Sequence, residues 1–140
     1  PYIQLIENNE SNILYLSDTP RLRQLYFEYG CRKYAKVRLK SLNFALKYMK
    51  SRNVDYRFLN YNNLREVDVN GIRLIFIYEY CLSEVQLLNL MPKENDVIVN
   101  LHGWNGKSCI SNQAYQLSKK MKVTLLTMED FYIYIHEIKK

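Results

Sequence analysis

The spacing of apolar side chains predicts helices in the first third of the chain. Thr19-Pro20 is a typical helix start, because the hydroxyl caps the helix and proline needs no N–H at the first helical position. A second helix is expected to run to about Arg52. Its apolar residues recur at spacings that keep them on one face: Ala35, Leu39, Leu42, Leu46 and Met49. Two short extended pieces are expected before these helices, at residues 2–6 and 13–16.

After Asp55 the pattern changes to that of strands. Three antiparallel strands are expected, at residues 56–59, 64–69 and 72–80. Asn70-Gly71 is a strong hairpin signal, because a type I′ turn needs positive φ at both central residues. With a two-residue turn there, Asp68 faces Arg73, and the two side chains are expected to form a cross-strand pair.

The last third of the chain alternates helices with strands. Helices are expected at residues 83–91 and 111–121, and buried parallel strands at 97–101 and 123–127, joined by a right-handed crossover. The expected fold class is therefore mixed α/β. A central sheet, an antiparallel meander followed by a strand–helix–strand unit, lies between helices on both faces.

The tail from Met128 fits two patterns. Phe131, Ile135 and Ile138 fit one face of a helix, whereas Phe131, Ile133 and Ile135 fit one face of a strand. We expect a helix that opens with two acidic residues, Glu129 and Asp130.

Composition narrows the class of protein. The 140 residues are 48% hydrophobic, which is expected for one packed domain over residues 1–140. The sequence contains no apolar run of the roughly 18 residues that a membrane span needs. Three cysteines without a CxxC pair favour a reducing, cytoplasmic setting over a disulfide framework or a zinc site. Two histidines exclude a multi-histidine metal centre.

The net charge of +6 is concentrated in one segment. Residues 21–52 hold ten basic residues and one acid, a charge of +9, which leaves −3 for the remainder. A block of this kind is typical of a polyanion site, although a merely solvated helix face is an equal alternative. The candidate nucleic-acid-binding residues in this segment are Arg32, Lys33, Lys36, Lys40, Lys47 and Lys50.

The loop after the strand at 97–101 is a second candidate site. It holds His102, Trp104 and Lys107 between a parallel strand and a helix, where backbone N–H groups attract anions. Trp104 would stack on a base while Lys107 pairs with a phosphate. The alternative is a glycine-rich connection with a half-buried Trp104. A phosphate-binding P-loop is disfavoured, because Leu101 stands where its first glycine is required.

Three segments carry a family resemblance over residues 39–138. They are the helix and strand LKSLNFALKYMKSRNVDYRF, the hairpin REVDVNGIRLIFIYEYC, and the closing VIVNLHGW with AYQLSKKMKVTLLTMEDFYIYI. In element order the chain resembles the restriction-endonuclease-like, or PD-(D/E)XK, fold and its Mrr-type domains. The resemblance implies an Asp on the second strand and a Glu-x-Lys on the third, which hold a divalent metal for phosphodiester cleavage.

The expected catalytic pattern is incomplete in this sequence. Glu79-Tyr80-Cys81 occupies the place of Glu-x-Lys, and Glu79 would face the amide Asn62. In the hairpin register, Asp68 lies roughly 20 Å and Glu66 about 13 Å along the strand from Glu79, too far to share one metal with it. Glu79, together with Glu66 or Asp68, is a catalytic candidate only if a displaced acid or lysine restores the metal site. The favoured interpretation is that Glu79 is an exposed or capping carboxylate.

Three functions remain open. The favoured one is a nucleic-acid-binding domain without cleavage and without a metal or other cofactor, with DNA preferred to RNA as partner. The second is an active Mg²⁺-dependent endonuclease. The third is an accessory subunit with a protein partner or a second copy of itself, because the 13 tyrosines are typical of interfaces.

Overall fold

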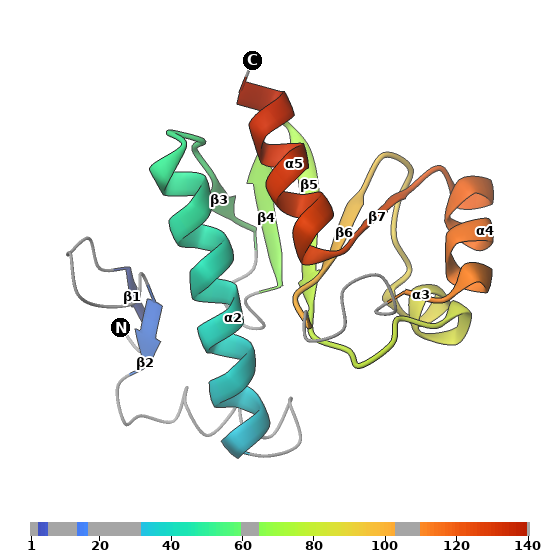
Figure 1. Ribbon diagram of the computed structural model, residues 1–140, viewed down its shortest axis with the longest axis horizontal. Helices are drawn as coiled ribbons and strands as arrows, with labels where there is room; N and C mark the ends of the chain where they lie inside the picture. Colours follow the sequence, from blue (N-terminus) through green and yellow to red (C-terminus); the bar gives the residue numbers. More distant parts are fainter. Residues whose placement is uncertain (1–2, 6–13, 17–31, 60–64, 103–109, 140) are drawn as a thin grey trace.

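The protein has a mixed α/β fold in which one sheet is packed between helices (Figure 1). The computed structural model describes residues 3–5, 14–16, 32–59, 65–102 and 110–139, with the backbone alone at 3–5, 14–16, 32–37, 39 and 139. The sheet has the order β3-β4-β5-β6-β7, with bounds Arg57–Phe58, Glu66–Val69, Ile72–Ile77, Val97–Asn100 and Thr124–Leu126. The helices in these described ranges are α2 (Arg32–Ser51), α3 (Glu84–Leu90), α4 (Asn112–Met121) and α5 (Met128–Lys139).

The expected strand pairing is confirmed. β3, β4 and β5 form an antiparallel meander, and β6 and β7 add parallel strands to the edge of β5. The turn between β4 and β5 has positive φ at Asn70 (54°) and Gly71 (84°), and Asp68 lies opposite Arg73 as predicted. The strands are shorter than expected: β5 ends at Ile77, before Glu79. At the start of the chain β1 (Ile3–Leu5) and β2 (Leu14–Leu16) pair antiparallel.

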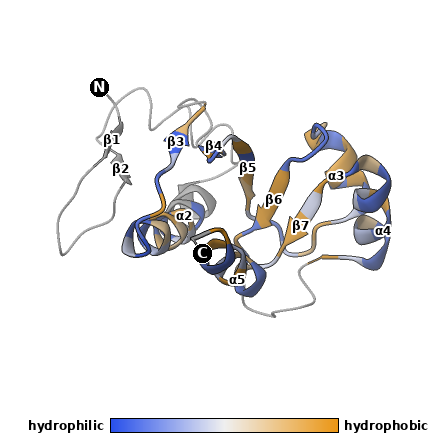
Figure 2. Cartoon of the chain, turned by 90° about the horizontal axis from the view of Figure 1, so that it is seen from above, coloured by the Kyte–Doolittle hydropathy of each residue, from blue (hydrophilic) through white to orange (hydrophobic). Residues whose placement is uncertain are grey.

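Two apolar layers cover the two faces of the sheet. On one face α2 and α5 pack side by side, through buried residues that include Leu42, Leu46 and Met49 of the predicted stripe and Phe131 and Ile135 of the tail (Figure 1). On the other face α3 and α4 pack against the sheet. In Figure 2, β5 and β6 are coloured as largely hydrophobic strands, which agrees with the burial of their residues on both faces.

Local capping explains where the later helices begin. Ser83 and Gln86 form a capping box at the start of α3, and Met91 ends it in the left-handed conformation before Pro92. Thr127 and Asp130 exchange hydrogen bonds at the start of α5. The tail is therefore a helix, as expected, and the strand alternative is wrong. The predicted helix that starts at Thr19-Pro20 lies outside the described residues. Within the described ranges, no helix combines the length and apolar character required to cross a membrane.

An ionic cluster joins β4, β5 and the loop before β6. Arg73 donates through Nε to Asp96 at 3.0 Å and through its guanidinium to Glu66 at 2.6 Å. Asp96 is buried and also accepts from the backbone N–H of Lys93 at 2.7 Å. The hydrogen bond that Arg73 donates to Asp96 raises the pKa of Arg73, and Glu66 adds to this effect. The hydrogen bonds of Arg73 thus go to Glu66 and Asp96 rather than to Asp68 opposite it.

We expect Arg73→Met to lower the free energy of unfolding by about 2–3 kcal/mol, because it leaves the buried Asp96 carboxylate without its charged partner. Urea denaturation measures the change. The control is Lys122→Met, which breaks an exposed pair with Glu94 and should cost less than about 0.5 kcal/mol. Equal effects of the two substitutions would contradict a structural role for the Arg73 cluster.

Candidate functional site

The carboxyl ends of β5 and β6 are tied together by one buried amide. Asn100 is fully buried, and its Oδ1 accepts from the backbone N–H groups of Glu79 at 3.0 Å and His102 at 3.2 Å. Its Nδ2 donates to the carbonyl of Glu79 at 2.9 Å. The segments that leave the two strands are therefore held in a fixed relation to each other.

The Glu79 carboxylate points toward α3. Its Oε2 accepts a hydrogen bond of 2.9 Å from Nε2 of Gln86, whose Oε1 accepts from the backbone N–H of Ser83 at 2.9 Å. The sequence predicts an exposed or capping carboxylate at Glu79, whereas the structure shows a half-buried one that does not cap α3. The cap of α3 is Ser83, and Glu79 binds the side chain that completes it.

The structure does not bring the three candidate acids together. Glu66 binds Arg73 and lies opposite Ile75, which precedes Glu79 by four residues in the chain. Asp68 is two residue pairs farther along the hairpin, opposite Arg73, while Asn62 lies outside the described residues. Within the described ranges no three His, Cys, Asp or Glu side chains gather as a metal would require. Cys81, which stands where the resemblance leads one to expect a lysine, is half-buried.

Two tyrosines flank His102 just beyond these strands. Its ring centroid lies 4.9 Å from that of Tyr78 and 5.5 Å from that of Tyr80. Tyr80 is 64% exposed, so one aromatic ring is accessible at this edge. Trp104 and Lys107, the predicted stacking and phosphate-binding residues of the same loop, lie outside the described residues.

The basic segment is divided between the surface and the interior. Lys40, Lys47 and Lys50 are exposed on α2, as the candidate site requires. The backbones of Arg32, Lys33 and Lys36 lie in the first turns of α2, and their side chains lie outside what is described. Arg38, which counts toward the charge of the same segment, is only 2% exposed and donates to the carbonyl of Phe76 at 3.3 Å.

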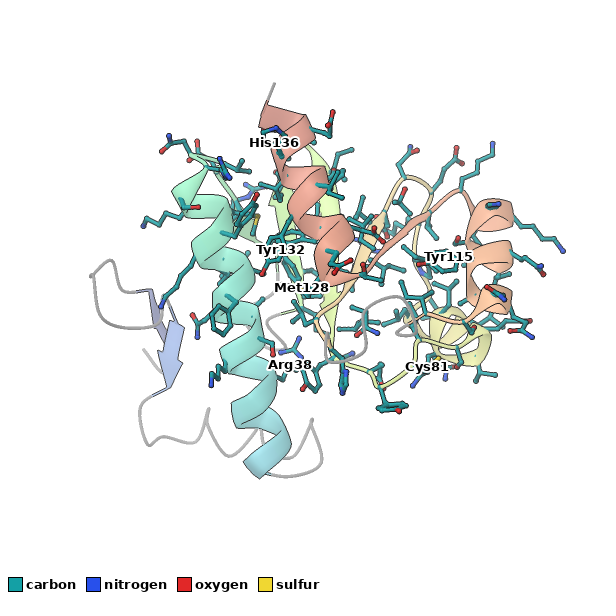
Figure 3. All side chains as sticks on the ribbon, in the orientation of Figure 1. Arg38, Cys81, Tyr115, Met128, Tyr132 and His136 are labelled. Carbon is teal, nitrogen blue, oxygen red and sulfur yellow. The ribbon has the colours of Figure 1, made fainter. Side chains whose placement is uncertain are left out.

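Aromatic rings accompany the exposed lysines of α2. Phe44 is 57% exposed and lines a shallow hollow with Lys47, Tyr48, Ser51 and Tyr132. The Tyr48 ring packs edge-on against Tyr132 at 4.5 Å, and its hydroxyl donates to the carbonyl of Tyr132 at 3.4 Å. In Figure 3, Tyr132 lies on α5 beside α2. We call Lys40, Phe44, Lys47, Tyr48 and Lys50 the outer face of α2.

Two features of these sites were missed in the sequence. Phe44 lies at helical spacing between Lys40 and Lys47, outside the apolar stripe, and this position was a signal for an exposed ring. Asn100 at the end of the apolar run Val97–Asn100 was a weaker signal, because only the parallel pairing of β5 and β6 identifies what it binds.

Comparison of the chain with protein-family models, with curated proteins and with solved structures gives no match in any of the three.

We expect Asn100→Ala to increase hydrogen exchange at the Glu79 and His102 amides by about tenfold or more, because both lose their acceptor. Exchange measured by NMR or mass spectrometry reports the effect. Gln116→Ala, an exposed change on α4, is the matched control and should leave both amides unchanged. Unchanged protection in Asn100→Ala would show that another group holds the two segments.

Proposed function

We propose that this chain is a nucleic-acid-binding domain, on a restriction-endonuclease-like scaffold that no longer cleaves, and that the outer face of α2 is its binding surface. The observation that carries the proposal is the sequence of exposed groups on α2, where lysines flank a largely exposed phenylalanine.

The lysines supply the attraction to phosphate. Lys40 and Lys47 lie two helical turns apart, and Lys50 lies one turn beyond Lys47. Exposed ammonium groups at this spacing can pair with successive phosphates of a strand and release their counterions. This contribution to binding is independent of base sequence.

The aromatic groups supply a surface for bases. An exposed ring such as Phe44 loses contact with water when a base stacks on it, a contribution of about 1–3 kcal/mol for each base. Tyr48 beside it is held by Tyr132, and the Arg52 guanidinium lies 5.4 Å from the Tyr48 ring centroid. A cation on a fixed ring provides a further group that phosphate or a base can contact.

The scaffold part of the proposal is supported by element order and by the acids. A helix, an antiparallel meander, and then strands β6 and β7 parallel to β5 follow the order on which the resemblance was based. The carboxylates of Glu79 and Glu66 are engaged by Gln86 and Arg73 respectively, at different levels of the sheet. This arrangement favours binding without cleavage, with DNA as the expected partner.

We expect single- and double-stranded oligonucleotides to bind at low salt, with affinity that falls as salt rises. Replacing Lys40, Lys47 and Lys50 together by Gln should reduce the slope of log affinity against log salt by about 2–3, because three phosphate contacts are lost. Fluorescence anisotropy measures the slope, and DNA compared with RNA tests the partner.

The matched control replaces Lys119, Lys120 and Lys122 by Gln. This removes the same charge from α4 and the residue that follows it, at the other end of the molecule from α2 (Figure 1). A similar loss of slope in both triple variants would indicate only a general effect of charge. Absence of any affinity for oligonucleotides at low salt would refute the proposed function. A protein partner would then be the remaining candidate for the outer face of α2.

We expect no nicking of supercoiled DNA with Mg²⁺ or Mn²⁺, because Gln86 and Arg73 bind the carboxylates of Glu79 and Glu66, and no three ligating side chains gather among the described residues. Gel electrophoresis over long incubation reads the result, with a known nuclease as positive control. Metal-dependent nicking that disappears in Glu79→Ala would overturn the inactive-scaffold part of the proposal, and DNA binding would stand by itself.

A further inference from the structure

A cavity of about 210 Å³ lies where α2, the residue before β4, the end of β5 and α3 meet. Its described polar lining consists of Arg38, Arg65, Tyr78, Glu79, Gln86 and Asn89. Figure 3 labels Arg38 in the amino-terminal half of α2. The cavity is distinct from the hollow beside Tyr132, because the two share none of their described lining residues.

The charge of the described lining is positive. It holds two guanidinium groups, Arg38 and Arg65, and one carboxylate, Glu79. Because a guanidinium stays protonated at any pH that a protein tolerates, both positive charges are permanent. A group that carries negative charge therefore gains from entering the cavity.

Both arginines are hydrogen-bonded to the same residue of the central strand, Phe76. Arg38 donates to the carbonyl of Phe76 at 3.3 Å, and the backbone N–H of Phe76 donates to the carbonyl of Arg65 at 2.6 Å. Phe76 is fully buried, so the core fixes the guanidinium of Arg38 and the backbone from which the Arg65 side chain extends. A donor that is already fixed, such as the Arg38 guanidinium, loses little entropy when it binds a ligand.

The lining favours a ligand rich in acceptors. Guanidinium groups only donate, and the amides of Gln86 and Asn89 can donate as well. The Glu79 carboxylate already accepts from Gln86. A water molecule takes about 30 Å³, so the cavity has room for a group several times larger. A tetrahedral phosphate, with oxygens that match the arginine fork, fits both the size and the donors.

We propose that this cavity binds a phosphate monoester group, whose oxygens accept hydrogen bonds from Arg38 and Arg65. Glu79 lines the same cavity, so its charge opposes the anion and limits the affinity. The same chemistry is offered by a free nucleotide and by the terminal phosphate of a nucleic-acid strand. The inference does not depend on the outer face of α2, because a mononucleotide could bind in the cavity without contacting that face.

The test titrates the full chain with inorganic phosphate, with thymidine 5′-monophosphate and with thymidine, and follows arginine and glutamine side-chain signals by NMR. Phosphate and the monophosphate are expected to bind, and thymidine is not. Arg65→Gln should weaken binding of the monophosphate by about tenfold to a hundredfold, the usual effect of losing one charged donor. Arg57→Gln, an exposed change on β3, is the matched control and should leave it unchanged.

Glu79→Gln should change the affinity for the monophosphate in the direction opposite to Arg65→Gln. It keeps both arginines and an acceptor for Gln86, and it should tighten binding of the monophosphate severalfold, because the repulsion is gone. A merely structural role of the cavity residues predicts no such gain. The proposal is overturned if neither phosphate nor the monophosphate binds, if Arg65→Gln binds as well as the parent chain, or if Glu79→Gln does not tighten binding.

A pair of oligonucleotides distinguishes the source of the phosphate. A short single strand with a 5′-phosphate is compared with the same strand ending in a 5′-hydroxyl. An affinity gain that Arg65→Gln abolishes identifies a strand end as ligand, and binding of the mononucleotide alone identifies a free nucleotide. The variant without Lys40, Lys47 and Lys50 should still bind the monophosphate, which separates this cavity from the proposed nucleic-acid surface.

Discussion

The enclosure of β5 on every side organises this protein. The strand is hydrogen-bonded to β4 on one edge and to β6 on the other, and an apolar layer covers each face. A polar side chain in the middle of such a strand would be costly to bury. Polar groups therefore gather at its two ends, with the Arg73 cluster at the start and Glu79 beyond the last pair.

Helix α2 serves the interior and the surface at once. Leu42, Leu46 and Met49 anchor it to the sheet, while Lys40 and Lys47 reach the solvent. The chemistry of the cations follows this division. The buried one is an arginine, whose weakly hydrated, planar group tolerates burial against a carbonyl, and the described exposed ones along the helix are lysines, which are strongly hydrated. Both proposed phosphate contacts thus involve the same helix by different means.

The elements that depend on local chemistry could be predicted from the sequence. Asn70-Gly71 fixed the register of β4 and β5, because few other residues adopt two positive φ angles in succession. The spacing of Phe131 and Ile135 predicted the final helix. Nucleic-acid binding and the family resemblance stay predictions.

The contacts that depend on the assembled sheet could not be predicted. Arg38 meets Phe76 only because α2 packs across β5, so charge spacing alone did not separate this buried cation from the exposed ones. Arg73 binds Asp96, which the parallel pairing of β6 brings near, and not the facing Asp68.

The side chain of Arg38 has a consequence for α2 as a whole. The hydrogen bond from Arg38 to Phe76 and the Tyr48–Tyr132 contact farther along the helix together prevent α2 from rotating about its own axis. The direction in which the lysines project is thus set from inside the fold, and a change in the core could redirect them without altering any residue that a ligand touches.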